Sequence, residues 1–304
     1  MSKSIKKFIE NPGLIFISLG HRGWFHWMSD ETYLKIAYRI KMGKKLNLDS
    51  PVTFNEKLQW LKLHDRKPEY TTMVDKYEAK KWVAERIGGG YVIPTLGVWE
   101  HFDEIDFDKL PNQFVLKCTH DSGGLVICRD KSKFDKEAAH KKIETCLKHN
   151  FFWGQREWAY KAVKPRILAE TYMEDETAKT MGSNGLTDYK FFCFNGIPKL
   201  VYVSCGLEHH ETAQISFLDM NWRFTEFRRS DYRPLNSVPL KPTQFDLMKN
   251  IAEHLSKNIP FVRVDLYEVK GKVFFGEVTF YPCSGFLPFE PEKYDKVLGN
   301  EISI

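Results

Sequence analysis

The residue pattern changes near residue 91, and this change limits the folds that the chain can adopt. Before it, apolar residues recur at the spacing of amphipathic helices. After it, short β-branched and aromatic runs alternate with turn residues, which is typical of strands, and two helices interrupt them, over residues 136–149 and after Thr243. The sequence therefore predicts an α+β protein whose strands pair mainly as hairpins, and it argues against a doubly wound parallel sheet. The expected strands cover residues 91–98, 113–117, 125–128, 167–173, 188–194, 199–204, 214–219, 261–267 and 273–281.

Three helices are expected in the first third of the chain. Asp30 is expected to cap the first helix, which ends near Gly43. Thr53 and Glu56 form a capping-box pattern at the start of the second. The third is expected over residues 72–87, because a run of glycines follows it.

The composition excludes several classes of protein. The chain has 304 residues, 42% of them hydrophobic, which suffices for one large or two packed domains and excludes a disordered chain. No apolar run exceeds four residues, so neither a membrane-spanning helix nor a secretory signal peptide is expected. The six cysteines form no CxxC pair, and they are expected to be buried thiols in a reducing cytosol. A catalytic thiol at Cys118 or Cys283 is the minor alternative.

The net charge of +5 is concentrated in the first fifty residues, which hold nine basic and four acidic side chains. A nucleic-acid-binding protein normally carries a basic stripe across its main domain, so binding to nucleic acid is not expected. Trp24, Phe25 and Trp27 lie among the basic residues, so the segment could dock weakly on the acidic inner face of the cytoplasmic membrane. Packing of these aromatic rings onto the rest of the fold is the favoured alternative. In either case we expect a cytoplasmic protein.

A strand–loop–strand segment over residues 114–128 carries a lysine followed by a glycine-rich loop. Lys117 ends the first expected strand, and Ser122, Gly123 and Gly124 lie in the loop. Glycine lets backbone N–H groups approach phosphate oxygens, and a lysine beside them supplies positive charge. The segment is not a Walker A motif, which leads from the glycine loop through Lys-Ser/Thr into a helix. From these residues alone, an ordinary glycine hairpin explains the pattern equally well.

Two strands near the C-terminus place two carboxylates on one face. Arg263 and Asp265 share a face of the first strand, and Glu277 and Thr279 share a face of the second. If the hairpin is centred on Gly271, Asp265 lies opposite Glu277. Two facing carboxylates repel each other unless a cation lies between them, and Mg²⁺ prefers such oxygen ligands. The alternative is a solvated strand face on which Arg263 neutralises one acid.

Further polar residues lie on the other expected strands. Glu170 ends an apolar strand that leads into a short acidic linker, which could contact an adenine amino group and a ribose, or could be an acidic surface turn. Asp188 and Lys190 share one face of their strand. Asn195-Gly196 is a strong signal for a tight hairpin turn.

In chain order, these segments resemble the ATP-grasp superfamily, and more closely its TupA-like branch, which is associated with surface-polysaccharide biosynthesis. The resemblance covers the chain from about residue 39 to the end. It is carried by TFNEKLQW (53–60), DKY (75–77), YVIPTLGV (91–98), the Lys117 segment, AE (169–170), DYK (188–190), the Asp265–Glu277 hairpin and PCSGF (282–286).

The resemblance implies a fold and a division into domains. ATP is expected to be held between two α+β subdomains. The expected parts are an N-terminal helical, basic segment over residues 1–72, a part with the lysine strand and glycine loop over residues 73–170, and a C-terminal subdomain with the metal-binding hairpin over residues 171–304.

The resemblance also implies roles for single residues in the binding of ATP. Lys76 and Lys117 match the two lysines on the phosphate side, and residues 119–124 match the mobile loop that closes over the triphosphate. The loop residues concerned are Thr119, Ser122, Gly123 and Gly124. Glu170 matches the adenine-binding hinge and Met173 its backbone position, with Glu174 or Glu176 on the ribose.

The remaining implied roles concern the metal and the transferred phosphoryl group. Arg263 lies against that group, and Lys190 has a weaker phosphate role. Asp265 and Glu277 hold Mg²⁺. Thr279 stands where the common pattern has Asn, and it could offer its hydroxyl to Mg²⁺ or to a water on it.

The activity implied is ATP-dependent carboxylate–amine ligation through an acyl phosphate, with ATP and Mg²⁺ as cofactors. The acid is expected to be a sugar acid such as a uronic acid, free or lipid-linked, or an amino acid, and the amine an amino acid or another amine. The pathway implied is capsule or lipopolysaccharide biosynthesis.

His209, His210 and Glu211 are expected to form an exposed polar loop and not a substrate or metal site.

Two alternatives to a ligase remain open. A glycosyltransferase of the same pathway would need a DxD-like metal motif, and the chain has only Asp106-Phe-Asp108, which is better interpreted as surface. A non-catalytic scaffold at the membrane would use the basic, aromatic N-terminus.

Overall fold

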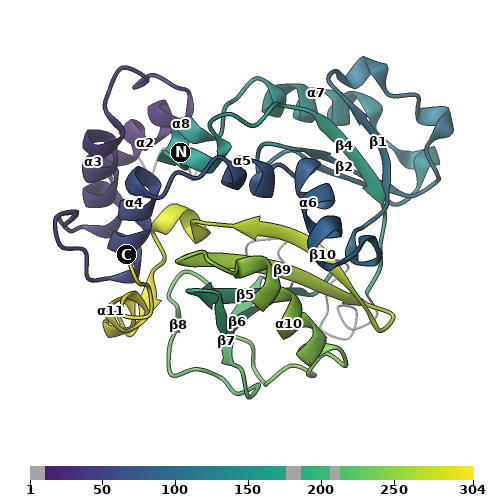
Figure 1. Cartoon of the computed structure of the whole chain (residues 1–304). Coiled ribbons are helices and arrows are strands. Elements are labelled where there is room, and N and C mark those ends of the chain that lie inside the picture. Colours follow the sequence, from purple (N-terminus) through teal and green to yellow (C-terminus); the bar gives the residue numbers. More distant parts are fainter. Residues whose placement is uncertain (1–10, 176–185, 206–212) are drawn as a thin grey trace. The chain divides into compact units, whose positions relative to one another are not determined.

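The computed structural model describes residues 11–175, 186–205 and 213–304 (Figure 1). The chain divides into two compact units, each made of separate stretches of sequence. Unit 1 consists of Met1–Pro51, Leu58–Tyr77 and Thr95–Tyr172, and unit 2 of Val52–Lys57, Glu78–Pro94 and Met173–Ile304. The division into residues 1–72, 73–170 and 171–304 stays a prediction.

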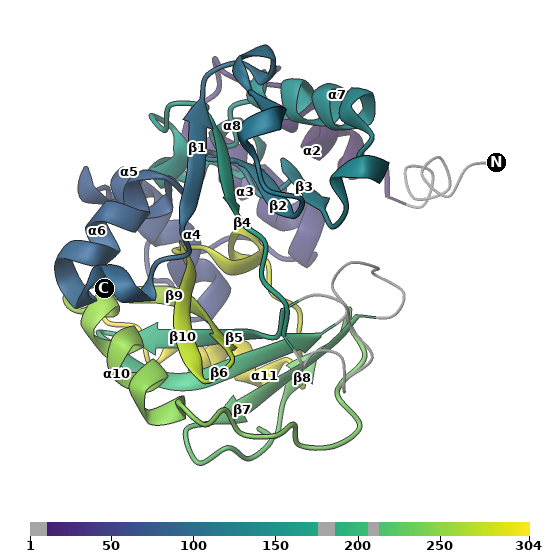
Figure 2. The same cartoon turned by 90° about the vertical axis from the view of Figure 1, so that its right-hand side faces the viewer.

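Unit 1 contains a four-stranded antiparallel sheet in the order β1-β4-β2-β3 (Figure 2). Burial alternates along β2, as expected of a strand with one covered face. Helix α7 (Lys136–Leu147) packs against β2 and β3, and Phe114, Leu116 and Ile143 are fully buried in the core there. The strands are β1 (Thr95–Trp99), β2 (Phe114–Cys118), β3 (Leu125–Cys128) and β4 (Ile167–Thr171).

The helix over Asp30–Met42 is capped by the residue before the expected one. The Ser29 hydroxyl accepts a hydrogen bond from the Thr32 N–H at 3.2 Å, so Ser29 and not Asp30 caps the helix. Asp30 instead accepts a hydrogen bond from Arg66 at 2.8 Å. The helix ends at Gly43 in the left-handed conformation, as expected. Besides α7, the helices with residues in unit 1 are α2 (Gly13–His21), α3 (Asp30–Met42), α4 (Phe54–His64), α5 (Glu69–Val74) and α8 (Phe152–Gln155).

The capping box at the start of α4 is confirmed. The Thr53 hydroxyl accepts a hydrogen bond from the Glu56 N–H at 3.2 Å, and the Glu56 carboxylate accepts one from the Thr53 N–H at 3.0 Å.

The helix expected over residues 72–87 is two helices. The backbone is extended at Asp75, where α5 ends, and α6 begins at Glu78 and ends at Ile87. The Asp75 carboxylate accepts a hydrogen bond from the Tyr77 N–H at 2.9 Å, a local turn that competes with helical pairing. This break places Lys76 outside both helices.

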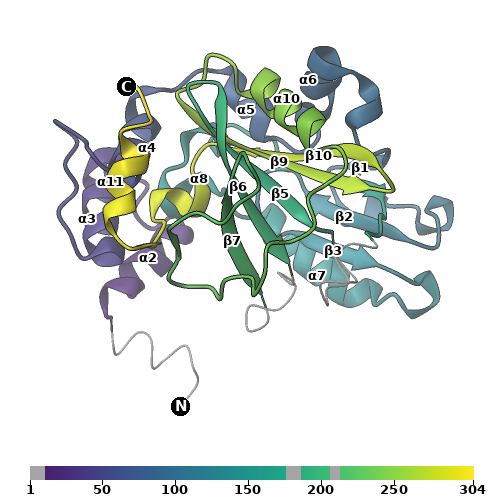
Figure 3. The same cartoon turned by 90° about the horizontal axis from the view of Figure 1, so that it is seen from below.

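Unit 2 contains a five-stranded antiparallel sheet in the order β10-β9-β5-β6-β7 (Figure 3). Helix α10 (Phe245–Ser256) packs on one face, where the rings of Phe191 and Phe245 are 5.8 Å apart. On the other face the ring of Phe54 packs edge-on against Phe261, at 4.8 Å. The strands are β5 (Asp188–Phe194), β6 (Ile197–Cys205), β7 (Gln214–Asp219), β9 (Phe261–Val269) and β10 (Lys272–Thr279).

Shorter elements complete the described part of the chain. β8 (Arg228–Arg229) and β11 (Phe289–Glu290) pair in a two-stranded sheet next to α11 (Lys293–Gly299). The 3₁₀ turns are Gly89–Tyr91, Phe102–Glu104, Phe107–Lys109, Lys131–Lys133, Trp158–Tyr160 and Pro282–Gly285.

Tight two-residue turns close two hairpins of unit 2. Asn195 and Gly196 have φ values of 51° and 81°, and Lys270 and Gly271 have 52° and 72°. Positive φ at both central residues is what a two-residue hairpin turn of this kind requires. The hairpin predicted at Asn195-Gly196 is therefore confirmed.

A β-bulge sets the register of the second hairpin. Its turn pairs Val269 with Lys272, and regular pairing from there would place Gly276 opposite Asp265. The register shifts between Phe275 and Glu277, so that Glu277 pairs with Asp265. The pairing predicted from the sequence is confirmed, but it arises from the bulge and not from a turn centred on Gly271.

The other expected strands agree with the structure apart from their ends, with one larger difference. The strand expected over residues 91–98 begins only at Thr95, because residues 89–91 form a 3₁₀ turn and Val92 makes an isolated bridge to Phe275.

The aromatic residues of the N-terminal segment divide into two groups. Phe25 stacks on Phe16, with ring centroids 4.4 Å apart, in line with the favoured expectation. Trp24 and Trp27 remain 64% and 71% exposed. In the parts of the chain that the structure describes, no helix is both long enough and apolar enough to span a bilayer.

Candidate functional site

Lys117 and Glu170 lie on neighbouring strands of unit 1, on the sheet face opposite the core. Val115 on β2 pairs with Glu170 on β4, and Lys117 follows Val115 by two residues, so Lys117 and Glu170 are diagonal neighbours on one face. Ile127 on β3 pairs with Val115, so both of these apolar residues lie on the same face. The Lys117 Nζ lies 2.6 Å from the Glu170 carboxylate, and Glu170 is almost fully buried. Val115 and Ile127 are half-buried beside them. Sequence reasoning missed these two residues, although the alternation along β2 and β3 indicates their face.

The loop between β2 and β3 is anchored at its base and exposed at its tip. The Asp121 carboxylate accepts a hydrogen bond from the Gly124 N–H at 3.0 Å. A ring nitrogen of His120 lies 3.1 Å from the Cys146 carbonyl oxygen, at the end of α7. Ser122 and Gly123 are exposed at the tip, where the Gly123 carbonyl oxygen accepts a hydrogen bond from the Leu125 N–H at 2.9 Å.

Glycine is required at the last position of this loop. A Cβ on Gly124 would lie 2.4 Å from the Cys118 Sγ, which is too close for any side chain. Lys76 reaches the same loop from the break after α5, since its ammonium donates to the Asp121 carbonyl oxygen. Unit 1 thus brings Lys76 to the loop that directly follows the Lys117 strand.

In unit 2, four strands each place one polar side chain in a row on the same sheet face. Glu277 on β10 pairs with Asp265 on β9, Asp265 with Lys190 on β5, and Lys190 with Tyr202 on β6. The Lys190 Nζ lies 2.9 Å from the Asp265 carboxylate and 3.2 Å from that of Asp188. Asp265 is completely buried, so its charge depends on these partners.

Arg263 lies between the two acids of the predicted metal site. Its guanidinium donates to both carboxylate oxygens of Asp265 at 2.6 and 2.7 Å, and to the Glu277 carboxylate at 2.9 Å. It also donates to the Thr279 hydroxyl at 3.0 Å. The sequence alternative had Arg263 neutralising one acid, whereas in the structure it contacts both.

These contacts shift the pKa values of Asp265 and Lys190. Burial alone would raise the pKa of Asp265, but the charges of Arg263 and Lys190 hold this pKa below its ordinary value. The acids Asp188 and Asp265 in turn outweigh burial and raise the pKa of Lys190. Both residues are therefore charged at neutral pH.

The donor atoms of the cluster fit a divalent ion that prefers oxygen. In the described part of the chain, no three His, Cys, Asp or Glu residues gather into a complete metal site. Mg²⁺, however, is usually held by one or two carboxylates together with waters and substrate phosphates. Asp265 and Glu277 supply two carboxylates on one face, and Thr279 adds a hydroxyl beside them.

The remaining predicted residues are placed as follows. Met173 is half-buried and Glu174 exposed, both directly after the last residue of unit 1. Glu176, His209, His210 and Glu211 lie outside the described residues. Burial raises the pKa of the Cys118 thiol, and the nearby Asp121 carboxylate adds to this effect, which argues against Cys118 as a nucleophile.

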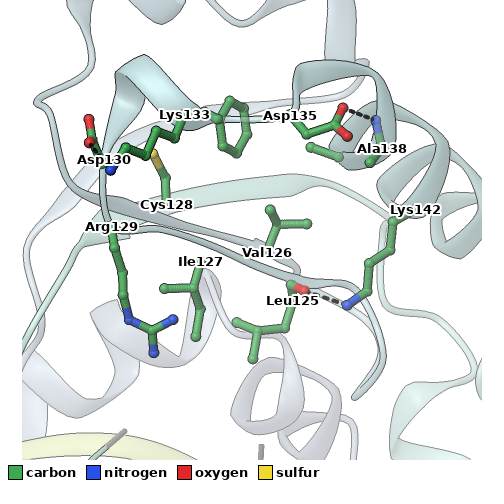
Figure 4. A pocket seen from close by; sticks show the side chains of 12 residues that line it. Leu125, Val126, Ile127, Cys128, Arg129, Asp130, Lys133, Asp135, Ala138 and Lys142 are labelled. Carbon is green, nitrogen blue, oxygen red and sulfur yellow. Dashed lines mark hydrogen bonds and ion pairs between the residues drawn. The ribbon is translucent and has the colours of Figure 1, made fainter. Parts of the chain in front are cut away.

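Two hollows lie elsewhere, and none of the predicted site residues lines either of them. In unit 1, a hollow of about 500 Å³ runs along β3 and α7, and Figure 4 shows Lys142 reaching across to the Leu125 carbonyl oxygen within it. In unit 2, a hollow of about 370 Å³ is lined partly by Phe224, Phe227 and Glu290.

The comparison with protein families gives one match that covers most of the chain. Residues 56–303 match the family described as TupA-like ATPgrasp. The chain belongs to this family. The matched segment contains every predicted site residue, from Lys76 to Thr279. A comparison with curated proteins finds no match.

Several solved structures of ATP-grasp ligases match part of the chain at low identity. A D-alanine–D-alanine ligase from Bacillus anthracis complexed with ATP is 15% identical with a TM-score of 0.42, and the match covers 76% of this chain and 64% of that one. The D-alanine–D-alanine ligase from Helicobacter pylori is 12% identical with a TM-score of 0.42, covering 82% and 69%. The ATP-grasp ligase PsnB, complexed with a precursor variant, Mg and ADP, is 9% identical with a TM-score of 0.38, covering 74% and 57%. The chain thus spans less than two thirds of the Bacillus anthracis and PsnB chains.

The family match confirms the predicted resemblance and the predicted α+β ATP-grasp fold. The roles of the single residues stay predictions.

Proposed function

We propose that this TupA-like ATP-grasp protein is an ADP-forming carboxylate–amine ligase that uses ATP and Mg²⁺. The observation that supports this most is the polar row of unit 2. There, Asp265 and Glu277 lie side by side with Arg263 and Lys190 against them. This set combines oxygen ligands for a divalent ion with two cations for phosphoryl oxygens, as phosphoryl transfer requires.

Unit 1 would supply the groups that hold the nucleotide. Lys117 and Lys76 carry positive charge beside a loop whose tip is exposed, and backbone N–H groups of such loops bind phosphate oxygens. Val115 and Ile127 offer an apolar surface for the adenine beside Glu170. Met173, with Glu174 or Glu176, would contact the hinge side of the base and the ribose.

The reaction proposed has two steps. An oxygen of the substrate carboxylate attacks the γ-phosphorus of ATP, and the bond to the β-phosphate oxygen breaks, which gives an acyl phosphate and ADP. The amine nitrogen then attacks the acyl carbon, phosphate leaves with the bonding electrons, and the amine loses a proton. The product is an amide.

Arg263 and Lys190 would stabilise the charge that develops in the first step. Asp265 and Glu277 would hold a divalent ion, and the Arg263 guanidinium, which is always charged, would contact phosphoryl oxygens. Mg²⁺ would neutralise charge on the β- and γ-phosphates. Thr279 would hold the ion or a water on it.

The substrates proposed are a sugar acid, such as a uronic acid, or an amino acid, and an amine or amino acid. The acid could be free or lipid-linked, in the biosynthesis of a capsule or lipopolysaccharide. No observation of the described residues favours a glycosyltransferase: Asp106 and Asp108, the acids of the DxD-like string, lie exposed on a short turn.

An assay of ADP release tests the proposal. We expect ADP to appear only when Mg²⁺, a carboxylic acid and an amine are all present, and we expect equimolar phosphate and amide. A panel of uronic acids and amino acids, each with a panel of amines, covers the proposed substrates. Release of a nucleoside diphosphate from a nucleotide sugar, with no use of ATP, would favour the glycosyltransferase instead.

A further inference from the structure

Asp75 lies at the break that carries Lys76, and its carboxylate forms an ion pair with Arg166, which directly precedes β4. The Arg166 guanidinium donates to the Asp75 carboxylate at 2.7 Å, and the side chains are 15% and 4% exposed. The same guanidinium lies over the ring of Tyr77, 4.8 Å from its centre. Arg166 thus contacts both sequence neighbours of Lys76.

The backbone of Arg166 holds the glycine loop at the same time. The Thr119 N–H donates to the Arg166 carbonyl oxygen at 2.9 Å, and the Arg166 N–H donates to the Thr119 hydroxyl at 3.2 Å. The Lys76 N–H donates to the Thr119 carbonyl oxygen at 3.1 Å. Three segments that are distant in sequence are therefore joined through one arginine.

The apolar spacing over residues 72–87 opposes this arrangement, because it predicts one continuous helix. The Asp75 carboxylate favours the break locally, since it accepts a hydrogen bond from the Tyr77 N–H at 2.9 Å, and the contact with Arg166 adds to this. A nearly buried, charge-assisted hydrogen bond is strong enough to outweigh the helix propensity of a few residues.

We propose that Asp75 and Arg166 are a positioning pair that fixes Lys76 and the 119–124 loop in the arrangement that receives the triphosphate of ATP. This inference rests on the proposed function, and it assigns a positioning role to two residues that the proposed function did not include. The pair acts by keeping the break after α5 open, so that the Lys76 ammonium stays beside the loop when no ligand is bound.

Three variants and a control test this role. Asp75→Asn keeps the acceptor for the Tyr77 N–H and removes the charge, Arg166→Gln removes the guanidinium, and the third variant combines both. Arg66→Gln is the matched control, because it breaks another Arg–Asp pair of unit 1, at 2.8 Å, outside the loop contacts. The measurements are the dissociation constant of Mg-ATP, KM and kcat, and hydrogen exchange of peptides covering residues 75–77 and 119–124 without nucleotide.

We expect each single variant to raise the dissociation constant and the KM of ATP about tenfold, with a smaller change in kcat. The double variant should raise the dissociation constant no more than the single variant with the larger effect, because both residues act through one contact. Exchange of the two peptides should be faster in all three variants and unchanged in the control. Arg166→Lys should restore part of the affinity if Arg166→Gln folds poorly.

Other results would overturn the inference. Parent-like affinity in both single variants would show that the pair does not position the site. Additive losses in the double variant would show that Arg166 acts on the nucleotide directly. A parent chain that does not bind Mg-ATP would overturn the proposed function and the inference with it, whereas normal binding by parent and variants overturns the inference alone.

Discussion

Arg263 contacts every residue of the proposed metal site in unit 2. It donates hydrogen bonds to the carboxylates of Asp265 and Glu277, and it takes the Thr279 hydroxyl as a third acceptor. Glu277 is the more accessible of the two acids, with a side chain 36% exposed, while Asp265 is fully buried. Glu277 is therefore the residue at which the metal role can be tested with the least harm to folding.

Glu277→Gln is expected to lower turnover on the order of a hundredfold, because the metal loses one charged ligand while the side-chain shape is kept. The melting temperature should stay close to that of the parent. The control is Glu290→Gln, which removes a carboxylate from an exposed ion pair with Arg228 in the same unit. Steady-state kinetics across Mg²⁺ concentrations checks this, and parent-like turnover of the Glu277→Gln variant would remove Glu277 from the metal site.

Gly276 is the extra residue of the bulge that brings Glu277 opposite Asp265. A Cβ at this position would lie 2.8 Å from the ring of Tyr267 and 3.1 Å from the Asp265 carbonyl oxygen. Gly276→Ala is therefore expected to lower the free energy of unfolding by about 1–3 kcal/mol, as overpacked sites do. Urea denaturation measures it, with Gly89→Ala as control, since nothing lies within 4 Å of a Cβ there. Equal stability of the two variants would mean that the bulge tolerates a side chain.

At the scale of elements, the sequence predicted most strands, the capping box and the hairpin turn, because each has a local signal. It missed the break at Asp75, whose carboxylate accepts hydrogen bonds from the Tyr77 N–H and from Arg166, ninety-one positions later. It predicted the pairing of Asp265 with Glu277 but not the bulge that produces this pairing. In the candidate site, the charged residues could be predicted from the sequence. Val115 and Ile127 could not, because apolar residues in a strand look alike whether or not they face a ligand.

Helix α4 contains a buried lysine, Lys62, whose contribution to the free energy of unfolding depends on pH. The Lys62 ammonium donates to the Gln59 side chain and to the Gln155 carbonyl oxygen, both at 2.9 Å, and burial lowers its pKa to about 7 from 10.5. Between these two pH values the unfolded chain binds the proton and the folded chain does not. The free energy of unfolding should therefore rise with pH in this window, by at most about 1.4 kcal/mol per pH unit from this group.

Comparison of the parent with Lys62→Met isolates this contribution. Denaturant unfolding at pH 7, 8 and 9 should show the parent gaining stability relative to the variant as the pH rises. A constant difference between the two proteins would mean that Lys62 stays protonated in the folded state.

At the scale of the whole molecule, the excess charge lies in the first fifty residues, together with the exposed Trp24 and Trp27. Each basic residue near an anionic surface contributes about 1 kcal/mol, and salt screens it. We expect the protein to sediment with anionic vesicles at low salt and to be released at high salt. Replacing both tryptophans by Ser should weaken this binding, while Leu240→Ser, at a residue 77% exposed in unit 2, should not. Equal partitioning to neutral and anionic vesicles would argue against membrane docking.

The most direct test of the proposed function is the melting temperature of the protein with and without Mg-ATP. A ligand at about 100 times its dissociation constant stabilises the folded state by about 2.7 kcal/mol, so the parent should melt at a clearly higher temperature. Lys117→Ala and Lys76→Ala should lose most of this shift, while Lys142→Ala, a lysine that bonds to the Leu125 carbonyl oxygen beside the same sheet, should keep it. An unchanged melting temperature of the parent at millimolar Mg-ATP would contradict the proposed nucleotide site.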